Sequence, residues 1–293
     1  MSELAKRVAF GVVAAPLALA IVLLGGAALA GLLAVASAIA AAEFYRISRA
    51  AGHAPLTDLG SALAGLFPLA VHAVYLGLLQ PRFGYLALVL IAVMSLSIWM
   101  RGAEGKPLGA VAVTVLGALY TGGLLSFAYA LRNHEYAVGE VHLGAIPIAA
   151  GGVLLGLPIL LTWANDTGAF FVGRTVRGPK LMPSISPGKT ISGAIGGVAA
   201  TVLVTWAYVA YALKPAAQLA LSPVGIVAFG ITISVAAQVG DLFESLLKRE
   251  AGVKNSSELL PGHGGVLDRL DSLFFVLPTA HVMLAWLLLP APR

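Results

Sequence analysis

Residues 8–45 read VAFGVVAAPLALAIVLLGGAALAGLLAVASAIAAAEFY, an apolar run in which Glu43 is the only charged residue. A helix that crosses a bilayer needs about 20 mostly apolar residues, so the run is long enough for two crossings. Gly25 and Gly26 interrupt it, and glycine permits the backbone of a tight turn. The stretch therefore predicts two spans joined by a hairpin. Merging them into one would invert the orientation of every later loop.

The composition of the whole chain supports this interpretation. Of its 293 residues, 59% are hydrophobic and 11% are charged, whereas a soluble protein has about 25% charged residues. The deficit extends over the whole length, which predicts an all-α polytopic membrane protein. The sequence contains no cysteine, which excludes a disulfide framework, a thiolate metal site and a cysteine nucleophile.

Hydropathy predicts nine transmembrane helices, at residues 8–25, 27–45, 60–79, 84–100, 108–131, 144–170, 191–213, 222–247 and 272–290. Lys and Arg collect in short cytoplasmic loops. With a cytoplasmic N-terminus, nine spans leave four of the 18 basic residues outside: Arg82, Arg132, Lys214 and Arg293. The pattern predicts a cytoplasmic N-terminus and an external C-terminus.

Two regions differ in character along the chain. Residues 1–140 hold spans one to five, and their loops are short and chemically plain. Residues 141–293 hold spans six to nine and two polar cytoplasmic loops, so we expect the catalytic region there. No internal repeat or inverted pair of interrupted helices is present, which disfavours a secondary transporter.

The first polar cluster covers residues 162–190. Asp166 lies in an apolar run, where an ionisable group indicates function; a structural carboxylate paired with Arg174 is the alternative. The later sequence Ser186-Pro187-Gly188-Lys189-Thr190 is typical of a small phosphate-binding loop that leads into a helix N-terminus. It lacks a glycine that a Walker A motif requires. A plain loop before an N-capped helix is the alternative.

The second cluster lies at the end of the eighth span. Helical spacing places Asp241, Glu244, Ser245 and Lys248 on one stripe. Such a stripe must face protein or water and not lipid. It indicates either functional groups or a structural set of ion pairs within the membrane.

The third cluster is Pro261-Gly262-His263-Gly264-Gly265, followed by a predicted helix start that carries Asp268, Asp271 and Ser272. Glycines free backbone amides to bind an anion. Carboxylates beside such a nest are how proteins hold Mg²⁺ against a nucleotide. The alternative is a glycine turn before a capped helix, and His263 alone is more typical of a loop residue than of a catalyst.

Together these stretches resemble one family. Ser245-Leu246-Leu247-Lys248-Arg249, then Lys254, then the run from Leu260 to Asp271 are similar to the signature of the phosphatidate cytidylyltransferases, which are CDP-diacylglycerol synthases. Residues 165–174 and 186–190 resemble that family's other cytoplasmic segment. The resemblance is specific over residues 162–272; before them it depends on hydropathy and on Glu43-Phe44-Tyr45.

The resemblance implies nine spans, a homodimer in the inner (cytoplasmic) membrane, and an active site that faces the cytoplasm. It implies CTP and phosphatidic acid as substrates, Mg²⁺ and K⁺ as cofactors, pyrophosphate release, and no nucleic-acid partner. The sequence departs from the family pattern at Asn255, where an acid is usual, and at Ile191-Ser192, which replace an acidic residue after Lys-Thr.

On this basis we assign roles to the polar residues. Metal ligands are Asp241, Asp268 and Asp271. The catalytic set is Asp241, Lys248, Arg249, His263, Asp268 and Arg269. Substrate and phosphate contacts are Asp166, Lys180, Ser186, Lys189, Thr190, Lys254, Gly264 and Gly265. Two alternatives stay open: a related CTP-dependent lipid kinase, and an ion-coupled transporter with Asp166 and Asp241 as its ion site.

Overall fold

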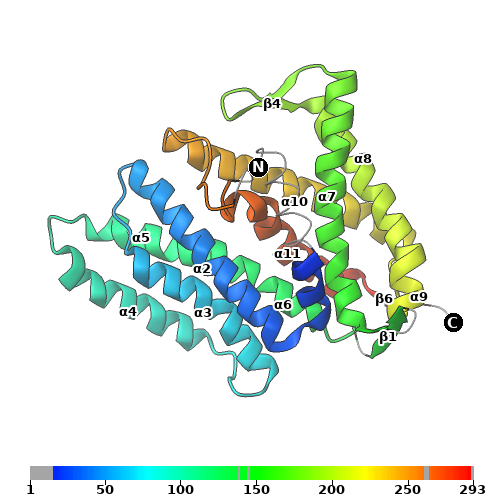
Figure 1. Ribbon diagram of the computed structural model, residues 1–293, viewed down its shortest axis with the longest axis horizontal. Helices are drawn as coiled ribbons and strands as arrows, with labels where there is room; N and C mark the ends of the chain where they lie inside the picture. The colour runs from blue at the N-terminus through cyan, green and yellow to red at the C-terminus, as the bar shows by residue number, and fades with distance from the viewer. Residues whose placement is uncertain (1–15, 138, 144–145, 261–263, 292–293) are drawn as a thin grey trace, which may run out of the picture. The chain divides into compact units, whose positions relative to one another are not determined.

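The computed structural model describes residues 16–137, 139–143, 146–260 and 264–291 (Figure 1). These residues form two compact units. The first contains residues 16–21, 26–129 and the described part of 246–270; the second contains residues 22–25 and the described parts of 130–245 and 271–291. Helices α10 (Pro223–Glu250) and α11 (Leu267–Leu287) each contribute to both units.

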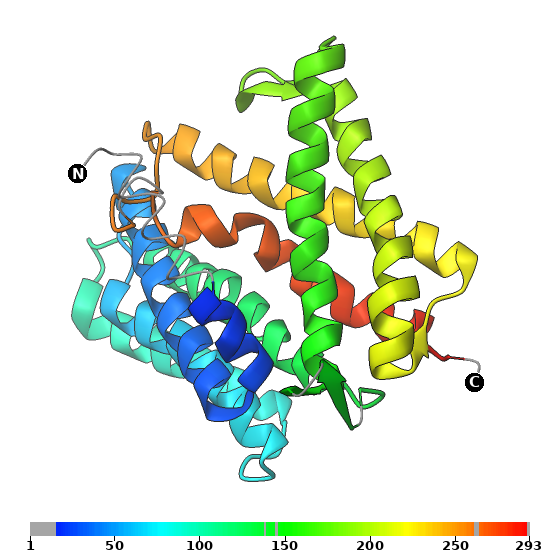
Figure 2. The same ribbon diagram turned by 45° about the vertical axis from the view of Figure 1, so that its right-hand side comes forward.

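The first unit is helical. Its elements are α2 (Gly26–Ala50), α3 (Thr57–Tyr75), α4 (Phe83–Arg101), α5 (Pro107–Ala118), the π-helix η1 (Leu119–Gly123) and the start of α6 (Phe127–Arg132), with the last turn of α10 and the first of α11. Figure 2 shows α2 to α5 as a set of neighbouring helices.

Tyr45 fixes the C-terminal part of α2 in this unit. Its side chain is fully buried, and its hydroxyl donates to the Thr114 carbonyl at 2.6 Å. Gly60 and Gly117 leave room for the ring, because a Cβ atom at either position would lie within 2.4 Å of a Tyr45 side-chain atom. The packing of Tyr45 therefore fixes the backbone of α2 next to Glu43.

The second unit contains the longest helices. Its elements are β1 (Glu140–Leu143), β2 (Ile146–Ala149), α7 (Ala150–Val176), β3 (Lys180–Met182), β4 (Ser186–Thr190), α8 (Ile191–Tyr208), the π-helix η2 (Val209–Leu213), α9 (Lys214–Ala217), β5 (Leu219–Ala220), β6 (Leu289–Pro290), and most of α10 and α11. The strands pair antiparallel as β1–β2, β3–β4 and β5–β6.

Small residues bring α7 and α8 together. A Cβ atom on Gly168 would lie 2.5 Å from that of Ala200, and one on Gly193 would lie 2.8 Å from the Ala169 carbonyl oxygen. Close backbone approach through small residues is a common way to pack membrane helices. The two helices run side by side in both ribbon views, and the β3–β4 hairpin joins them at one end (Figures 1 and 2).

Eight helices in the described part of the chain are long and apolar enough to cross a membrane. They correspond to the second to ninth predicted spans. The first predicted span, residues 8–25, lies partly outside the described residues, although residues 16–24 are helical. Gly25 and Gly26 adopt φ values of +69° and +56°, which confirms the predicted break between the first two spans. The total of nine and the orientation of the termini stay predictions.

Two segments differ from the sequence predictions. The sixth span was expected from residue 144, but Ile146–Ala149 forms β2 and the helix runs from Ala150 to Val176. Ile146 and Ile148 are β-branched, which favours a strand. Ser186–Thr190 was expected to be a loop, but it forms β4 and pairs with β3, with Lys180 opposite Thr190. The fold is thus mainly helical with small hairpins at helix ends.

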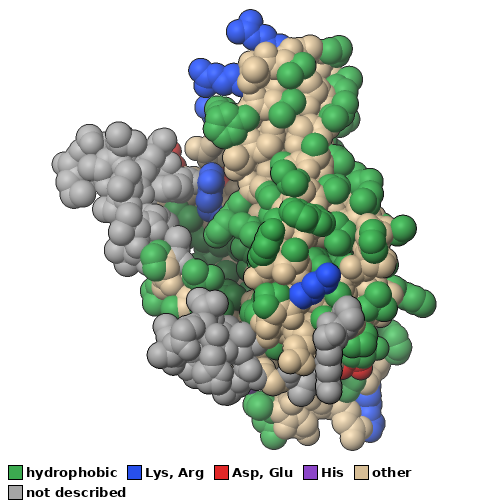
Figure 3. Space-filling model, turned by 90° about the vertical axis from the view of Figure 1, so that its right-hand side faces the viewer, with side chains coloured by type: hydrophobic (Ala, Val, Ile, Leu, Met, Phe, Trp, Pro, Cys, Tyr) green, Lys and Arg blue, Asp and Glu red, His purple; other side chains and the backbone are tan. Residues whose placement is uncertain are grey.

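Exposed apolar side chains are abundant on these helices. Phe83, Leu108 and Trp286 are each more than 80% exposed, and hydrophobic side chains dominate the face shown in Figure 3, with several Lys and Arg side chains near the top of the view. Exposed apolar surface of this extent fits contact with lipid better than contact with water. The fold is that of a multi-pass membrane protein.

Candidate active site

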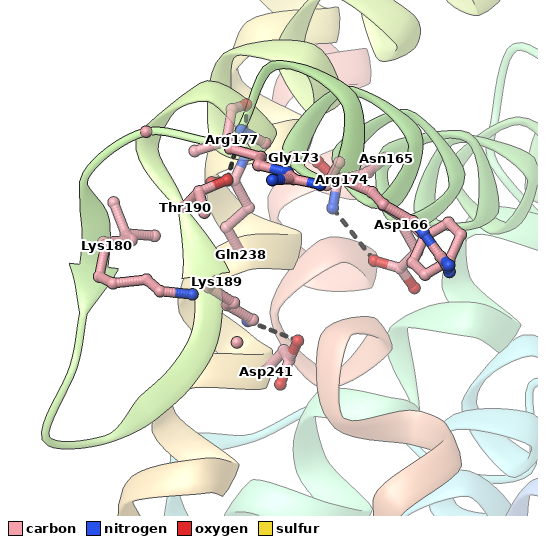
Figure 4. Close-up of a pocket in the computed structure, with 17 residues that line it drawn as sticks. Asn165, Asp166, Gly173, Arg174, Arg177, Lys180, Lys189, Thr190, Gln238 and Asp241 are labelled. Carbon is pink, nitrogen blue, oxygen red and sulfur yellow. Dashed lines mark hydrogen bonds and ion pairs between the residues drawn. The ribbon is translucent and has the colours of Figure 1, made fainter.

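A pocket of about 780 Å³ lies in the second unit (Figure 4). Its described lining includes two acids, Asp166 and Asp241, and four basic residues, Arg174, Arg177, Lys180 and Lys189. The basic excess suits a ligand with several negative charges. Five residues that were predicted from the sequence as site residues line this pocket together: Asp166, Lys180, Lys189, Thr190 and Asp241.

The hairpin and the eighth span meet through an ion pair. Lys189 Nζ lies 2.5 Å from Asp241 Oδ2, and their side chains are 26% and 34% exposed. Ser245, one turn further along α10, donates a hydrogen bond to Asp241 Oδ1 at 3.4 Å. Asp241 of the predicted α10 stripe thus pairs with a residue of β4.

The start of α8 anchors β4. The Thr190 side chain accepts a hydrogen bond from the Gly193 amide at 3.1 Å, which is an N-cap. The Ser192 hydroxyl donates to the carbonyl of Arg177, a residue held at a φ of +60°. These contacts fix the position from which Lys189 reaches Asp241. Ser186 lies opposite Met182, outside the described lining of the pocket.

A buried amide network forms the inner wall of the pocket. Asn165 is 2% exposed; its Oδ1 accepts from Ser234 at 2.7 Å and from Gln238 at 3.4 Å, and its Nδ2 donates to Asp166 at 3.2 Å. The amide of Gln238 also donates to the Ala194 carbonyl at 3.1 Å. The network ties α7, α8 and α10 together beneath Asp166. The sequence analysis missed both amides, although polar side chains within apolar spans were the available signal.

A second cluster of predicted residues lies in the first unit. Lys248 Nζ lies 2.8 Å from Asp268 Oδ1, and their side chains are 14% and 8% exposed. Asp268 Oδ2 accepts from the Ser256 amide at 3.0 Å, the Ser256 hydroxyl at 2.8 Å and the Gly265 amide at 2.8 Å. Both oxygens of this carboxylate therefore have donors from the chain itself.

Other residues that were predicted to bind substrate or to take part in catalysis also lie in the first unit. Lys254 and Asn255 line a hollow of about 600 Å³ with Arg46 in the first unit. Gly264 has a φ of +80°, as the tight turn requires. Arg249 and Arg269 are exposed. His263 lies outside the described residues.

Asp271 belongs to the second unit, where its Oδ1 accepts from the Ser272 amide at 2.5 Å. A Cβ atom on Gly240 would lie 2.7 Å from the Asp271 carbonyl oxygen, so α10 and α11 pack backbone to backbone there. Among the described residues, no group of three or more His, Asp or Glu side chains that could hold a metal ion is found.

The fold and these sites define a class: a multi-pass α-helical membrane protein with paired charged groups at the ends of its helices. A model of the cytidylyltransferase family matches residues 5–287. The chain therefore belongs to this family, and the resemblance drawn from its motifs is confirmed.

Curated relatives carry one name. The chain is 34% identical over 176 residues to the phosphatidate cytidylyltransferase of Bacillus subtilis (strain 168), covering 60% of this chain and 58% of that protein. It is 42% identical over 125 residues to that of Staphylococcus epidermidis (strain RP62A), covering 43% and 46%. It is 35% identical over 208 residues to that of Staphylococcus haemolyticus, covering 69% and 78%. The chain thus spans about half the length of the first two relatives.

Proposed function

We propose that this protein transfers CMP from CTP to phosphatidic acid, which gives CDP-diacylglycerol and pyrophosphate. The observation that carries the proposal is the pocket whose described lining gathers four basic side chains, among them Lys189, which pairs with Asp241. Its residues lie in the chain of a cytidylyltransferase family member, and curated relatives bear the name phosphatidate cytidylyltransferase.

The reaction joins two anions, so neutralising charge is the main task of the site. An oxygen of the phosphatidate phosphate attacks the α-phosphorus of CTP, and the bond from that phosphorus to the β-phosphate oxygen breaks. Pyrophosphate leaves with the electron pair. A phosphate monoester is already ionised at neutral pH, so no general base is needed. Lys180 and Lys189 hold phosphates as point charges, and Arg174 and Arg177 add to the positive field of the pocket.

The donor set of the pocket fits Mg²⁺. This ion binds proteins through one or two carboxylates and takes its other ligands from water and substrate phosphates. Asp241 offers a partly exposed carboxylate, but its Oδ2 pairs with Lys189, so a metal ion could bind that oxygen only once Lys189 has turned to a substrate phosphate. A Mg²⁺ ion held by this carboxylate would supply positive charge against the substrate phosphates and the leaving pyrophosphate. Asp166 and Asp271 are further candidate ligands. We also propose that the reaction depends on K⁺.

Asp268 has a different position in the proposal. Because Lys248, Ser256 and Gly265 occupy both of its oxygens, it can bind a metal ion only after Lys248 moves away from Oδ1. Its role in the arrangement described here is to hold the Lys248 ammonium group. Lys248, Arg249, Lys254 and Arg269 are proposed as additional phosphate contacts.

The proposal also covers the setting of the protein. We place it in the inner membrane as a homodimer, with the polar helix ends facing the cytoplasm, because most Lys and Arg residues fall on that side of the predicted topology. The test of the function is to incubate the purified protein with CTP, Mg²⁺ and phosphatidic acid. Mass spectrometry should find CDP-diacylglycerol and pyrophosphate in equal amounts. Their absence with all components present would refute the proposal.

A further inference from the structure

Glu43 is a buried acid that the proposed mechanism leaves unused. It lies on α2 and is 5% exposed. Burying a carboxylate is costly unless hydrogen bonds compensate for the lost water. The contacts of Glu43 therefore identify what this acid is for.

Four donor groups, all from residues 256–267, lie within hydrogen-bonding distance of the Glu43 carboxylate. Oε1 accepts from the Ser257 hydroxyl at 2.5 Å and the Val266 amide at 3.2 Å. Oε2 accepts from the Leu267 amide at 2.7 Å and lies 3.1 Å from the Ser256 hydroxyl, whose single proton it shares with Asp268 Oδ2. Each partner is more than 200 positions away in sequence. One side chain on α2 thus holds both ends of the segment before α11.

Two of these donors lie at the N-terminus of α11, which begins at Leu267. The first amides of a helix have no partner within it, and the helix dipole favours a negative group at that end. Glu43 caps α11 from a distant part of the sequence. The cap therefore fixes where the helix starts, one residue before Asp268.

Ser256 connects Glu43 to Asp268. Its hydroxyl lies 3.1 Å from Glu43 Oε2 and 2.8 Å from Asp268 Oδ2, and its amide donates to the same Asp268 oxygen. A displacement of Glu43 therefore shifts a donor that Asp268 uses while Asp268 holds Lys248.

The space around Gly265 gives independent evidence that Glu43 and Ser256 pack closely against the residues before α11. A Cβ atom at Gly265 would lie 2.4 Å from Glu43 Oε2 and 2.1 Å from the Ser256 hydroxyl oxygen. The amide of Gly265 donates to Asp268 at 2.8 Å. Glycine is needed here because Glu43 occupies the space of a side chain.

We propose that Glu43 is a positioning residue, which holds the segment that begins at Ser256 and the start of α11, through the contacts described, so that Asp268 is oriented against Lys248. The inference depends on the proposed function for its effect on activity, since it assigns Asp268 and Lys248 to the reaction. Its structural part, the anchoring of the segment, does not depend on that function.

The test uses Glu43→Gln, which keeps the size of the side chain but leaves one oxygen and one NH₂ group to face four donors. We expect kcat to fall at least about tenfold with the KM for CTP changed less than about threefold. The matched control is Glu104→Gln, which removes the same charge from an exposed position in the same unit, and it should keep wild-type kcat. Ser257→Ala removes a single donor and should lower kcat in the same direction by a smaller factor; it serves if Glu43→Gln does not fold.

A double substitution separates positioning from general destabilisation. In an Asp268→Asn background, Glu43→Gln should change the remaining rate by less than about twofold, because its effect passes through Asp268. A full tenfold loss in that background would contradict the proposal.

A spectroscopic measurement covers the case in which the protein makes no CDP-diacylglycerol. The chain has no cysteine, so a single spin label can be placed by Glu258→Cys at an exposed site in the segment. Glu43→Gln and Ser257→Ala should each increase the mobility of this label, and Glu104→Gln should not. Unchanged mobility in both variants overturns the inference. Absence of product from the wild type, with increased mobility in the variants, refutes only the proposed function.

Discussion

Asp241→Asn separates a structural role from a catalytic one. The substitution keeps the shape of the side chain and removes the charge that pairs with Lys189 at 2.5 Å. Both side chains are about one-quarter to one-third exposed, and ion pairs of this kind contribute about 0.2–1 kcal/mol to stability. Since proteins unfold with about 5–15 kcal/mol, the variant should fold and insert into the membrane.

The effect on the reaction should be much larger. A carboxylate that holds a metal ion against substrate phosphates contributes several kcal/mol to the transition state. A loss of about 2.7 kcal/mol lowers turnover about a hundredfold. We therefore expect kcat to fall by at least about two orders of magnitude, with little change in thermal stability.

The assay measures initial rates of CDP-diacylglycerol formation in detergent micelles at saturating CTP, together with a Mg²⁺ titration and a thermal unfolding curve. Asp58→Asn provides a matched control, because it makes the same change at an exposed acid in the first turn of α3. The variant at Asp241 should also need more Mg²⁺. Near-normal turnover with unchanged Mg²⁺ dependence would place the metal site elsewhere and refute the reasoning.

Three further predictions test other parts of the account. Lys189→Met should raise the KM for CTP about tenfold, or about 1.4 kcal/mol, because it removes a point charge from the pocket, whereas Lys214→Met should leave it unchanged; an unaltered KM in the first would contradict phosphate binding. Single cysteines test the topology: Glu135→Cys should react with an impermeant maleimide added to intact cells and Glu258→Cys only after permeabilisation, and the reverse pattern would exclude nine spans. Asn255→Asp restores an acid usual in the family and should preserve or raise activity; a severe loss in a folded variant would show that this segment is organised differently.

Hydropathy was sufficient for the predicted spans that fall on described residues, because each needs only a long apolar run. It failed at residues 146–149, expected as part of a helix, and the motif pattern failed at 186–190, expected as a loop; pairing within a hairpin decides the structure of both. Each of these strands forms because it pairs with another strand, and the hydrophobic periodicity of one segment does not show which segment it pairs with.

The site was predicted unevenly for a similar reason. Asp166 and Asp241 were found because charged groups are rare in apolar spans, and Lys189 because its loop is typical of phosphate binding. The partner of each charge was not predictable, since Lys189 and Lys248 pair with acids on other segments. Glu43 was noted as part of a motif but not as a site residue. Glu43, like Asp166, is an acid in an apolar run, which indicates function.

The central claim is that CMP, and not the γ-phosphate of CTP, passes to the lipid. The direct measurement is to supply the purified protein with phosphatidic acid, Mg²⁺ and CTP labelled with ³²P at either the α or the γ position. The account predicts that the α label enters the lipid fraction and the γ label appears in pyrophosphate. A γ label in the lipid, with CDP as the other product, would contradict the account and identify a lipid kinase.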